Sequence, residues 1–275
     1  MTITVGIFLI LFGVAFVCEF IDSSTGMGYG TILSPILIIY GFEPSIAVPA
    51  VLFSQALGGF SATIFHFRFK NLSFQPKSNS LRSSILIAII GVIATVFAAF
   101  ISISIPKYLL KSYIGLLVLV MGIILLTKLT FKASMKKITF IAILSAFNKG
   151  LSGGGFGPVT TSGQIISGQD EKTAIGVTTF SEVPICLAGT LTYIIGKITL
   201  ETPSVLSIPV RDFFDILLSG RIVNLELILA LSLGAVLSTP FGALTTRLIK
   251  PKSLRRTLGI IVTILGIWTL YKTWF

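Results

Sequence analysis

The feature that most constrains this chain is a succession of apolar stretches, each about as long as the roughly 20 helical residues needed to cross a bilayer. Seven such stretches occupy residues 3–21, 44–66, 84–105, 108–127, 172–196, 223–246 and 254–274. Only 11% of the residues are charged and the mean hydropathy is +0.98, whereas a soluble domain carries about 25% charged residues. So few charges would not cover a soluble surface, and the pattern predicts an all-α integral membrane protein.

Positive charge gathers in short gaps between the apolar stretches, although the formal net charge of +11 could suggest nucleic acid as a partner. This placement follows the positive-inside rule and argues against a nucleic-acid partner. The three strongly basic gaps, 68–82, 128–137 and 247–256, are therefore expected in the cytoplasm. No Lys or Arg precedes Arg68, so the N-terminus of this multi-pass protein of the cell (plasma or inner) membrane is expected outside.

Some apolar segments are too short to cross a bilayer alone, and they adjoin glycine-rich breaks: 31–41, 138–149 and 159–168. In hydrocarbon, non-helical backbone must be buried in protein or line a wet cavity. If 138–168 enters and returns to the same side, the basic gap 247–256 lies in the cytoplasm with the others, whereas a single crossing would place it outside. A re-entrant pair is therefore expected there and, by analogy, over 3–41, although 3–21 is long enough to span by itself.

Self-comparison shows an internal repeat. Five residues, Phe20, Gly26, Gly28, Tyr29 and Gly30, recur 127 residues later as Phe147, Gly153, Gly155, Phe156 and Gly157. A second echo closes each half, because Pro106, Lys107 and Leu109 return as Pro251, Lys252 and Leu254. We interpret residues 1–130 and 135–275 as two inverted-topology repeats of one transmembrane domain, each a broken, re-entrant helix pair followed by three transmembrane helices. This arrangement is typical of secondary transporters.

The glycine-rich breaks are candidate anion sites. Helices are expected to restart near Thr31 and Val159, with Pro158 at the first position. Glycine lets backbone N–H groups approach a ligand, and a helix N-terminus adds partial positive charge. The candidate substrate-binding residues are Ser24, Thr25, Gly26, Met27, Gly28, Tyr29, Gly30, Gln55, Lys149, Ser152, Gly153, Gly154, Gly155, Phe156, Gly157 and Gln164. Glycines also allow close helix packing in membranes, and Gln55 and Gln164 could equally join helices.

Lys149 is the only Lys or Arg expected at membrane depth. A cation there is costly unless it meets an anion or a carboxylate. It could compensate the charge of a substrate, or it could pair with Asp22, which occupies the corresponding position of the first repeat. Asp22, Glu19 and Glu182 are intramembrane carboxylates and candidates for coupling transport to protons or sodium, although Glu19 could also lie at an interface.

Other function classes find little support in the residues. Cys18 and Cys186 lie in apolar segments and His66 is the single histidine, so neither a metal nor a cofactor is expected. No nucleophile stands beside a base at a recognisable spacing, which argues against an enzyme. ATP drive is not expected without a GxxxxGK[ST] loop. An anion channel, which would share the glycine breaks, is the main alternative to a secondary transporter, and a membrane-embedded enzyme is a weaker one.

The glycine breaks also carry a family resemblance. The segments EFIDSSTGMGYGTILSPIL and NKGLSGGGFGPVTTSGQII, with the two-half layout, resemble the TauE/SafE-type sulfite exporter family of membrane permeases. The resemblance covers nearly the whole chain and is strongest at 18–66 and 146–190. It implies movement of sulfite or a related anion, such as thiosulfate or a sulfonate, through the inner membrane. The repeat architecture predicts alternating access, with the substrate held near mid-membrane between the two breaks. The resemblance leaves open the substrate, the direction, the coupling ion and a homodimer. Lys149 stands where the first half has Asp22, so the site need not be symmetric.

Overall fold

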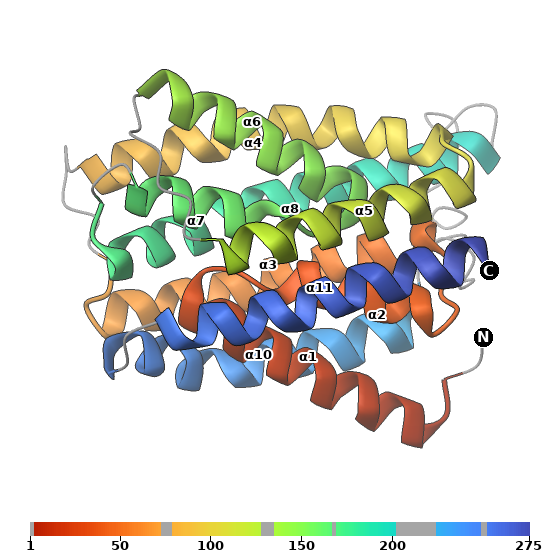
Figure 1. The fold of residues 1–275 in the computed structure, drawn as a ribbon, viewed down its shortest axis with the longest axis horizontal. Helices are drawn as coiled ribbons and strands as arrows, with labels where there is room; N and C mark the ends of the chain where they lie inside the picture. Colours follow the sequence, from red (N-terminus) through yellow and green to blue (C-terminus); the bar gives the residue numbers. More distant parts are fainter. Residues whose placement is uncertain (1–2, 73–78, 128–134, 167–168, 202–223, 249–251) are drawn as a thin grey trace, which may run out of the picture.

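The computed structural model describes residues 3–72, 79–127, 135–166, 169–201, 224–248 and 252–275. These residues form α-helices (Figure 1). In chain order the helices are α1 (Val5–Thr25), α2 (Tyr29–Ile39), α3 (Pro44–Arg68), α4 (Asn79–Ser104), α5 (Lys107–Leu126), α6 (Met135–Ser152), α7 (Phe156–Ile166), α8 (Glu171–Glu201), α10 (Leu225–Leu248) and α11 (Lys252–Trp274). The predicted all-α fold class is confirmed.

Seven of the described helices are long and apolar enough to cross a membrane: α1, α3, α4, α5, α8, α10 and α11. They coincide with the seven stretches predicted from the sequence. The three short segments also became helices, and α2 and α7 have only 11 residues each. Helix α1 qualifies as a span by length and composition, so the placement of 3–21 relative to a bilayer stays open.

The helices on either side of each glycine break form a hairpin. In Figure 1, α1 runs inward from the end of the long axis where α11 finishes, and α2 returns toward that end. The pair α6 and α7 enters from the opposite end. This is the course that a re-entrant pair would follow, while the position of the bilayer stays a prediction.

The predicted helix restarts were two to three residues late. Helix α2 begins at Tyr29 rather than near Thr31, and α7 begins at Phe156 rather than near Val159. Pro158 is consequently the third residue of α7, not the first. It still lies in the first turn, where a missing N–H group breaks no intrahelical hydrogen bond.

The packing partners correspond between the two halves. Helix α1 packs along α10 as α6 packs along α4, and α3 packs on α10 as α8 packs on α4. Helix α3 faces α8, and α5 faces α11. Exchanging the five helices α1 to α5 for the five described helices α6 to α11, in order, carries each of these pairs into another or into itself. One difference is that α2 also lies against α11 and α5, whereas α7 lies mainly against α6 and α8.

The distribution of polarity is that of a protein in lipid. Large apolar side chains point outward along α4, where Ile89, Ile93 and Phe97 are 56–65% exposed. Charged side chains such as Glu19 and Lys149 are buried among the helices. Such outward apolar surface is costly in water and favourable in hydrocarbon. Charged residues inside a membrane protein, in contrast, mark functional positions.

Candidate functional site

Both glycine breaks end the preceding helix in the same way. Helix α1 stops at Gly26, whose φ is 71° and whose N–H donates to the carbonyl of Asp22 at 2.6 Å. Helix α6 stops at Gly153, whose φ is 76° and whose N–H donates to the carbonyl of Lys149 at 2.8 Å. Left-handed φ values favour glycine at such helix ends. The equivalent last turns therefore carry Asp22 in one half and Lys149 in the other.

The two breaks also contact each other. A Cβ atom on Gly30 would overlap the carbonyl oxygen of Gly153, and one on Gly157 would overlap that of Gly26. Thr161 Oγ1 donates to the same Gly26 carbonyl at 2.8 Å. The glycines at this crossing therefore let the two hairpins approach backbone to backbone, which supports the packing role considered for them.

A charged centre lies beside the crossing, and we define it as Asp22, Gln55, Lys149 and Glu182. Lys149 Nζ forms an ion pair with Glu182 Oε1 at 2.8 Å and also donates to Gln55 Oε1. Gln55 Nε2 in turn donates to Asp22 Oδ2 at 3.4 Å. All four side chains are buried. The hypothesis of a direct Lys149–Asp22 pair is thus corrected: Glu182 is the ionic partner, and Gln55 bridges Lys149 and Asp22.

The charged centre follows the internal repeat. Gln55 and Glu182 are separated by the same 127 residues that separate Asp22 and Lys149. One half supplies the hydrogen-bonded pair Asp22 and Gln55, and the other supplies the ion pair Lys149 and Glu182. Sequence reasoning named all four residues but missed this pairing. Extending the repeat comparison from the glycine breaks into the following helices would have found it.

At each helix restart, one of the N–H groups predicted to meet an anion already has a partner. The N–H of Tyr29 donates to Asp22 Oδ1 at 3.1 Å, so a carboxylate occupies the N-terminus of α2, where a helix favours negative charge. At the second break, the N–H of Gly155 donates to Thr31 Oγ1 at 3.1 Å. In this conformation both groups are satisfied within the protein.

Most of the other predicted binding residues serve the local structure of the breaks. The hydroxyls of Ser24, Thr25 and Ser152 each donate to the carbonyl four residues earlier in the same helix. Met27 and Phe156 are buried in the apolar core. These side chains shape the breaks, and the hydrogen bonds described here do not involve the ammonium group of Lys149.

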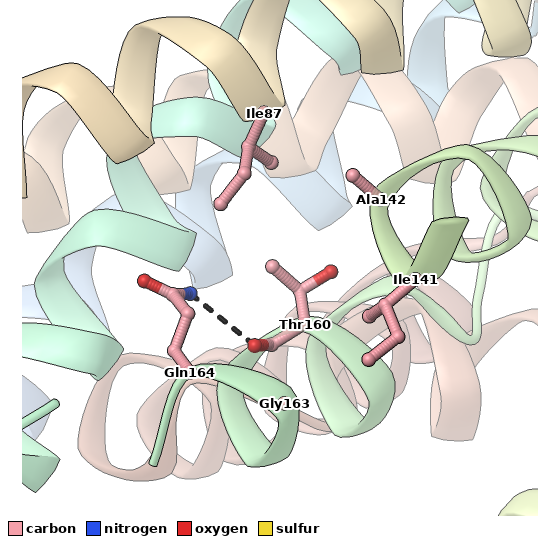
Figure 2. Close-up of a pocket in the computed structure, with 6 residues that line it drawn as sticks. All are labelled: Ile87, Ile141, Ala142, Thr160, Gly163 and Gln164. Atoms are coloured by element: carbon pink, nitrogen blue, oxygen red, sulfur yellow. Dashed lines mark hydrogen bonds between the residues drawn. The ribbon is translucent and has the colours of Figure 1, made fainter. Parts of the chain in front are cut away.

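Gln164 has other partners than the charged centre and borders a small recess (Figure 2). Its Nε2 donates to the carbonyl of Thr160 at 3.3 Å and to Thr178 Oγ1 at 2.8 Å, whereas its buried Oε1 has no hydrogen-bond partner. It borders a recess of about 10 Å³, close to the smallest space that holds one water molecule. The recess is lined by Ile87, Ile141, Ala142, Thr160, Gly163 and Gln164. The two glutamines that the sequence placed in one site therefore have different partners in the structure.

Glu19 is the most enclosed of the carboxylates. It is 0% exposed, and neither carboxyl oxygen has a hydrogen-bond partner. A Cβ atom on Gly58 would lie 3.0 Å from Glu19 Cδ, so the backbone of α3 covers this side chain closely. Glu19 thus lies in the protein interior, and its depth relative to the membrane interface stays a prediction.

Membrane-length helices around a buried ion pair and two broken helices define the class of this molecule: a multi-pass membrane protein with a polar centre, as in secondary transporters. The sequence matches the family described as "Sulfite exporter TauE/SafE" over residues 11–269, and the chain belongs to this family. The resemblance read from the glycine breaks is therefore confirmed.

A curated relative agrees with this assignment. The chain is 23% identical over 279 residues to the "Probable membrane transporter protein YtnM" of Bacillus subtilis (strain 168), and the alignment covers 97% of this chain and 84% of that protein. No solved structure matches the chain. Family and relative together identify a membrane transporter.

Proposed function

We propose that the protein is a secondary transporter of a small anion, namely sulfite or a related sulfur oxyanion or sulfonate, and that it works by alternating access. The family supports this substrate class. The observation that carries the proposal is Lys149, an ammonium group only 1% exposed in the last turn of α6, next to both glycine breaks.

An anion that crosses the protein interior needs compensating positive charge, since an unpaired ion there costs several kcal/mol. A helix N-terminus supplies only about half a unit. Lys149 is the one buried Lys or Arg among the residues that the structure describes. The substrate would bind to it between the two breaks, near the middle of the membrane.

The enclosure of the charged centre supports alternating access. Asp22, Gln55, Lys149 and Glu182 are each at most 4% exposed, so a substrate can reach Lys149 only after helices move. Inverted repeats over 1–130 and 135–275 offer a route, because exchanging the conformations of the halves opens the centre to the other side. The corresponding packing partners support this repeat. With the basic gaps in the cytoplasm, the transporter would lie in the cell membrane with an external N-terminus.

Uptake into proteoliposomes tests the proposal. The purified protein should accumulate at least one of sulfite, thiosulfate, sulfoacetate or sulfate. An imposed pH gradient should change the accumulation, with a fixed ratio of protons to anions transported. Lys149→Met should abolish uptake, whereas Lys107→Met, which removes an exposed lysine, should not. Equal uptake by the Lys149→Met variant, or no uptake of any of these anions, would contradict the proposal. Passive flux that merely follows the electrochemical gradient would indicate a channel.

A further inference from the structure

The charges of the charged centre and of the neighbouring Glu19 do not balance without additional protons. Three carboxyl groups, those of Glu19, Asp22 and Glu182, interact electrostatically with the single ammonium group of Lys149. If every group were ionised, negative charge would exceed positive charge before any substrate arrived. An anion added to that arrangement would be repelled, and buried uncompensated charge is expensive.

Lys149 already has two oxygen partners in this conformation. Its Nζ contacts Glu182 Oε1 and Gln55 Oε1. Gln55 is neutral and can reorient without changing the charge. Glu182 is the ionic partner, so an anion that becomes the counter-ion of Lys149 takes the place of this carboxylate.

We propose that Glu182 is the exchangeable counter-ion of Lys149: the substrate anion takes its place on the ammonium group, and Glu182 accepts one proton as it leaves. This inference rests on the proposed function. The balance is simple, because an ammonium–carboxylate pair, one monovalent anion and one proton become an ammonium–anion pair and a neutral carboxylic acid. No covalent bond in the substrate changes. Each transported negative charge thereby brings a proton into the protein.

The geometry selects Glu182 rather than the other carboxylates. Asp22 already accepts hydrogen bonds from Tyr29 N–H and Gln55, and no direct ion pair joins it to Lys149. Glu19 has no hydrogen-bond partner and does not bond to Lys149. Only Glu182 would lose its cation when an anion binds, so Glu182 gains most from protonation.

The groups around Glu182 are few. Helix α3 presents the neutral Gln55, with His66 and Arg68 in its last turn, and α7 carries no titratable side chain. On α4 the titratable residue is Arg82, in the first turn. The titratable groups of this interior region are Cys18, Glu19 and Asp22 on α1, Tyr29 on α2, Lys149 on α6 and Cys186 on α8.

The test measures proton uptake on anion binding by the full-length protein in detergent. Methanesulfonate is the probe, because its single charge does not titrate between about pH 5 and about pH 8. Calorimetry in two buffers of different ionisation enthalpy should show about one proton taken up per anion, with Kd rising about tenfold per pH unit at the alkaline end. Glu182→Gln, which mimics the neutral acid, should bind with no proton uptake and no such pH dependence. The control Glu43→Gln, a half-exposed carboxylate, should behave as wild type.

The outcomes separate the two proposals. Anion binding without proton uptake, or the same uptake in Glu182→Gln, would overturn the exchange while leaving anion transport intact. Loss of proton uptake in Asp22→Asn but not in Glu182→Gln would assign the proton to Asp22 and would also overturn the exchange. Failure of wild type to bind methanesulfonate, sulfite or thiosulfate at any pH would overturn the proposed function itself. Should Glu182→Gln fail to fold, the infrared difference spectrum of wild type decides, since anion binding must create a protonated carboxyl band.

Discussion

At the scale of single residues, the buried ion pair dominates the energetics of the site. Lys149 and Glu182 have left water, so their mutual attraction and hydrogen bonds replace hydration that an apolar interior cannot supply. Breaking such a pair from one side leaves a lone charge, whereas removing both charges does not. This asymmetry distinguishes a structural lysine from one that binds substrate.

We therefore expect Lys149→Met to lower the free energy of unfolding by about 3–5 kcal/mol. The double variant Lys149→Met with Glu182→Gln should recover most of that stability, because no unpaired charge remains, yet it should not transport. Denaturant unfolding in detergent and proteoliposome uptake are the two measurements. Full transport by the double variant would show that Lys149 serves only to neutralise Glu182.

The exposed pair between Lys107 and Glu43 provides the matched control. Lys107 Nζ donates to Glu43 Oε1 at 2.6 Å, and this hydrogen bond lowers the pKa of Glu43. Because the pKa is lowered on folding, the pair stabilises the protein above the ordinary carboxyl pKa of about 4.3 and loses its effect as pH falls through the lowered value. Lys107→Met should cost less than about 1 kcal/mol at neutral pH and nothing in strong acid. A cost that persisted in acid would mean lost packing rather than lost charge.

At the scale of elements, the crossing of the two hairpins determines where every central residue lies. The α1–α2 and α6–α7 breaks touch through backbone atoms at Gly30 and Gly153 and at Gly157 and Gly26. Asp22 and Lys149, in the turns just before the breaks, are therefore held near each other and near α3 and α8. A shift of the α6–α7 hairpin would move Lys149 relative to Gln55, and a shift of the α1–α2 hairpin would move Asp22 relative to Gln55.

Alanine at Gly30 or Gly157 should separate the hairpins, since the new Cβ would overlap a carbonyl oxygen. We expect a loss of about 1–3 kcal/mol of stability from overpacking, together with weaker transport. Gly13→Ala is the control, because nothing lies within 4 Å of a Cβ there. Unfolding midpoints in detergent measure the difference, and equal midpoints for Gly30→Ala and Gly13→Ala would contradict the close crossing.

Gly28 and Gly155 are a different case, because their φ values of 138° and 82° disfavour any L side chain. A β-branched residue at either position should destabilise the fold through backbone strain, measured as a lower unfolding temperature. Transport loss with unchanged stability would instead indicate that these backbone groups meet the substrate.

At the scale of the whole molecule, the directions of the helices and the positions of the basic gaps together predict which end of the molecule faces the cytoplasm. The C-terminal end of α10 and the N-terminal end of α4 lie at one end of the long axis, and the C-terminal end of α4 and the N-terminal end of α10 lie at the other (Figure 1). With the basic gaps in the cytoplasm, the first end faces inward. The gap residues 73–78, 128–134 and 249–251 lie outside the described residues.

Cysteine labelling in intact cells checks this orientation. Single cysteines at Ser104 and Asn224 should react with an impermeant thiol reagent, while those at Ser80 and Leu248 should be protected until the membrane is permeabilised. The native Cys18 and Cys186 are buried, so background labelling should be low. External labelling at Leu248 together with Ser104 would exclude the inverted repeat.

The sequence by itself determined the features that depend on local composition. The length of apolar runs predicted the seven membrane-length helices, and glycines at Gly26 and Gly153 marked the helix ends because few other residues adopt left-handed φ. The repeat spacing also pointed to Asp22 and Lys149 as equivalent positions. These signals need no knowledge of which helices meet.

The tertiary structure alone decided which groups contact one another. Lys149 pairs with Glu182, not with Asp22, because the crossing of the hairpins directs the last turn of α6 toward α8 and α3. Gln164 falls beside Thr178 because it lies in the last turn of α7, well beyond the glycine break. Side-chain contacts between helices depend on the crossing geometry, and hydropathy and residue spacing along one chain do not contain it.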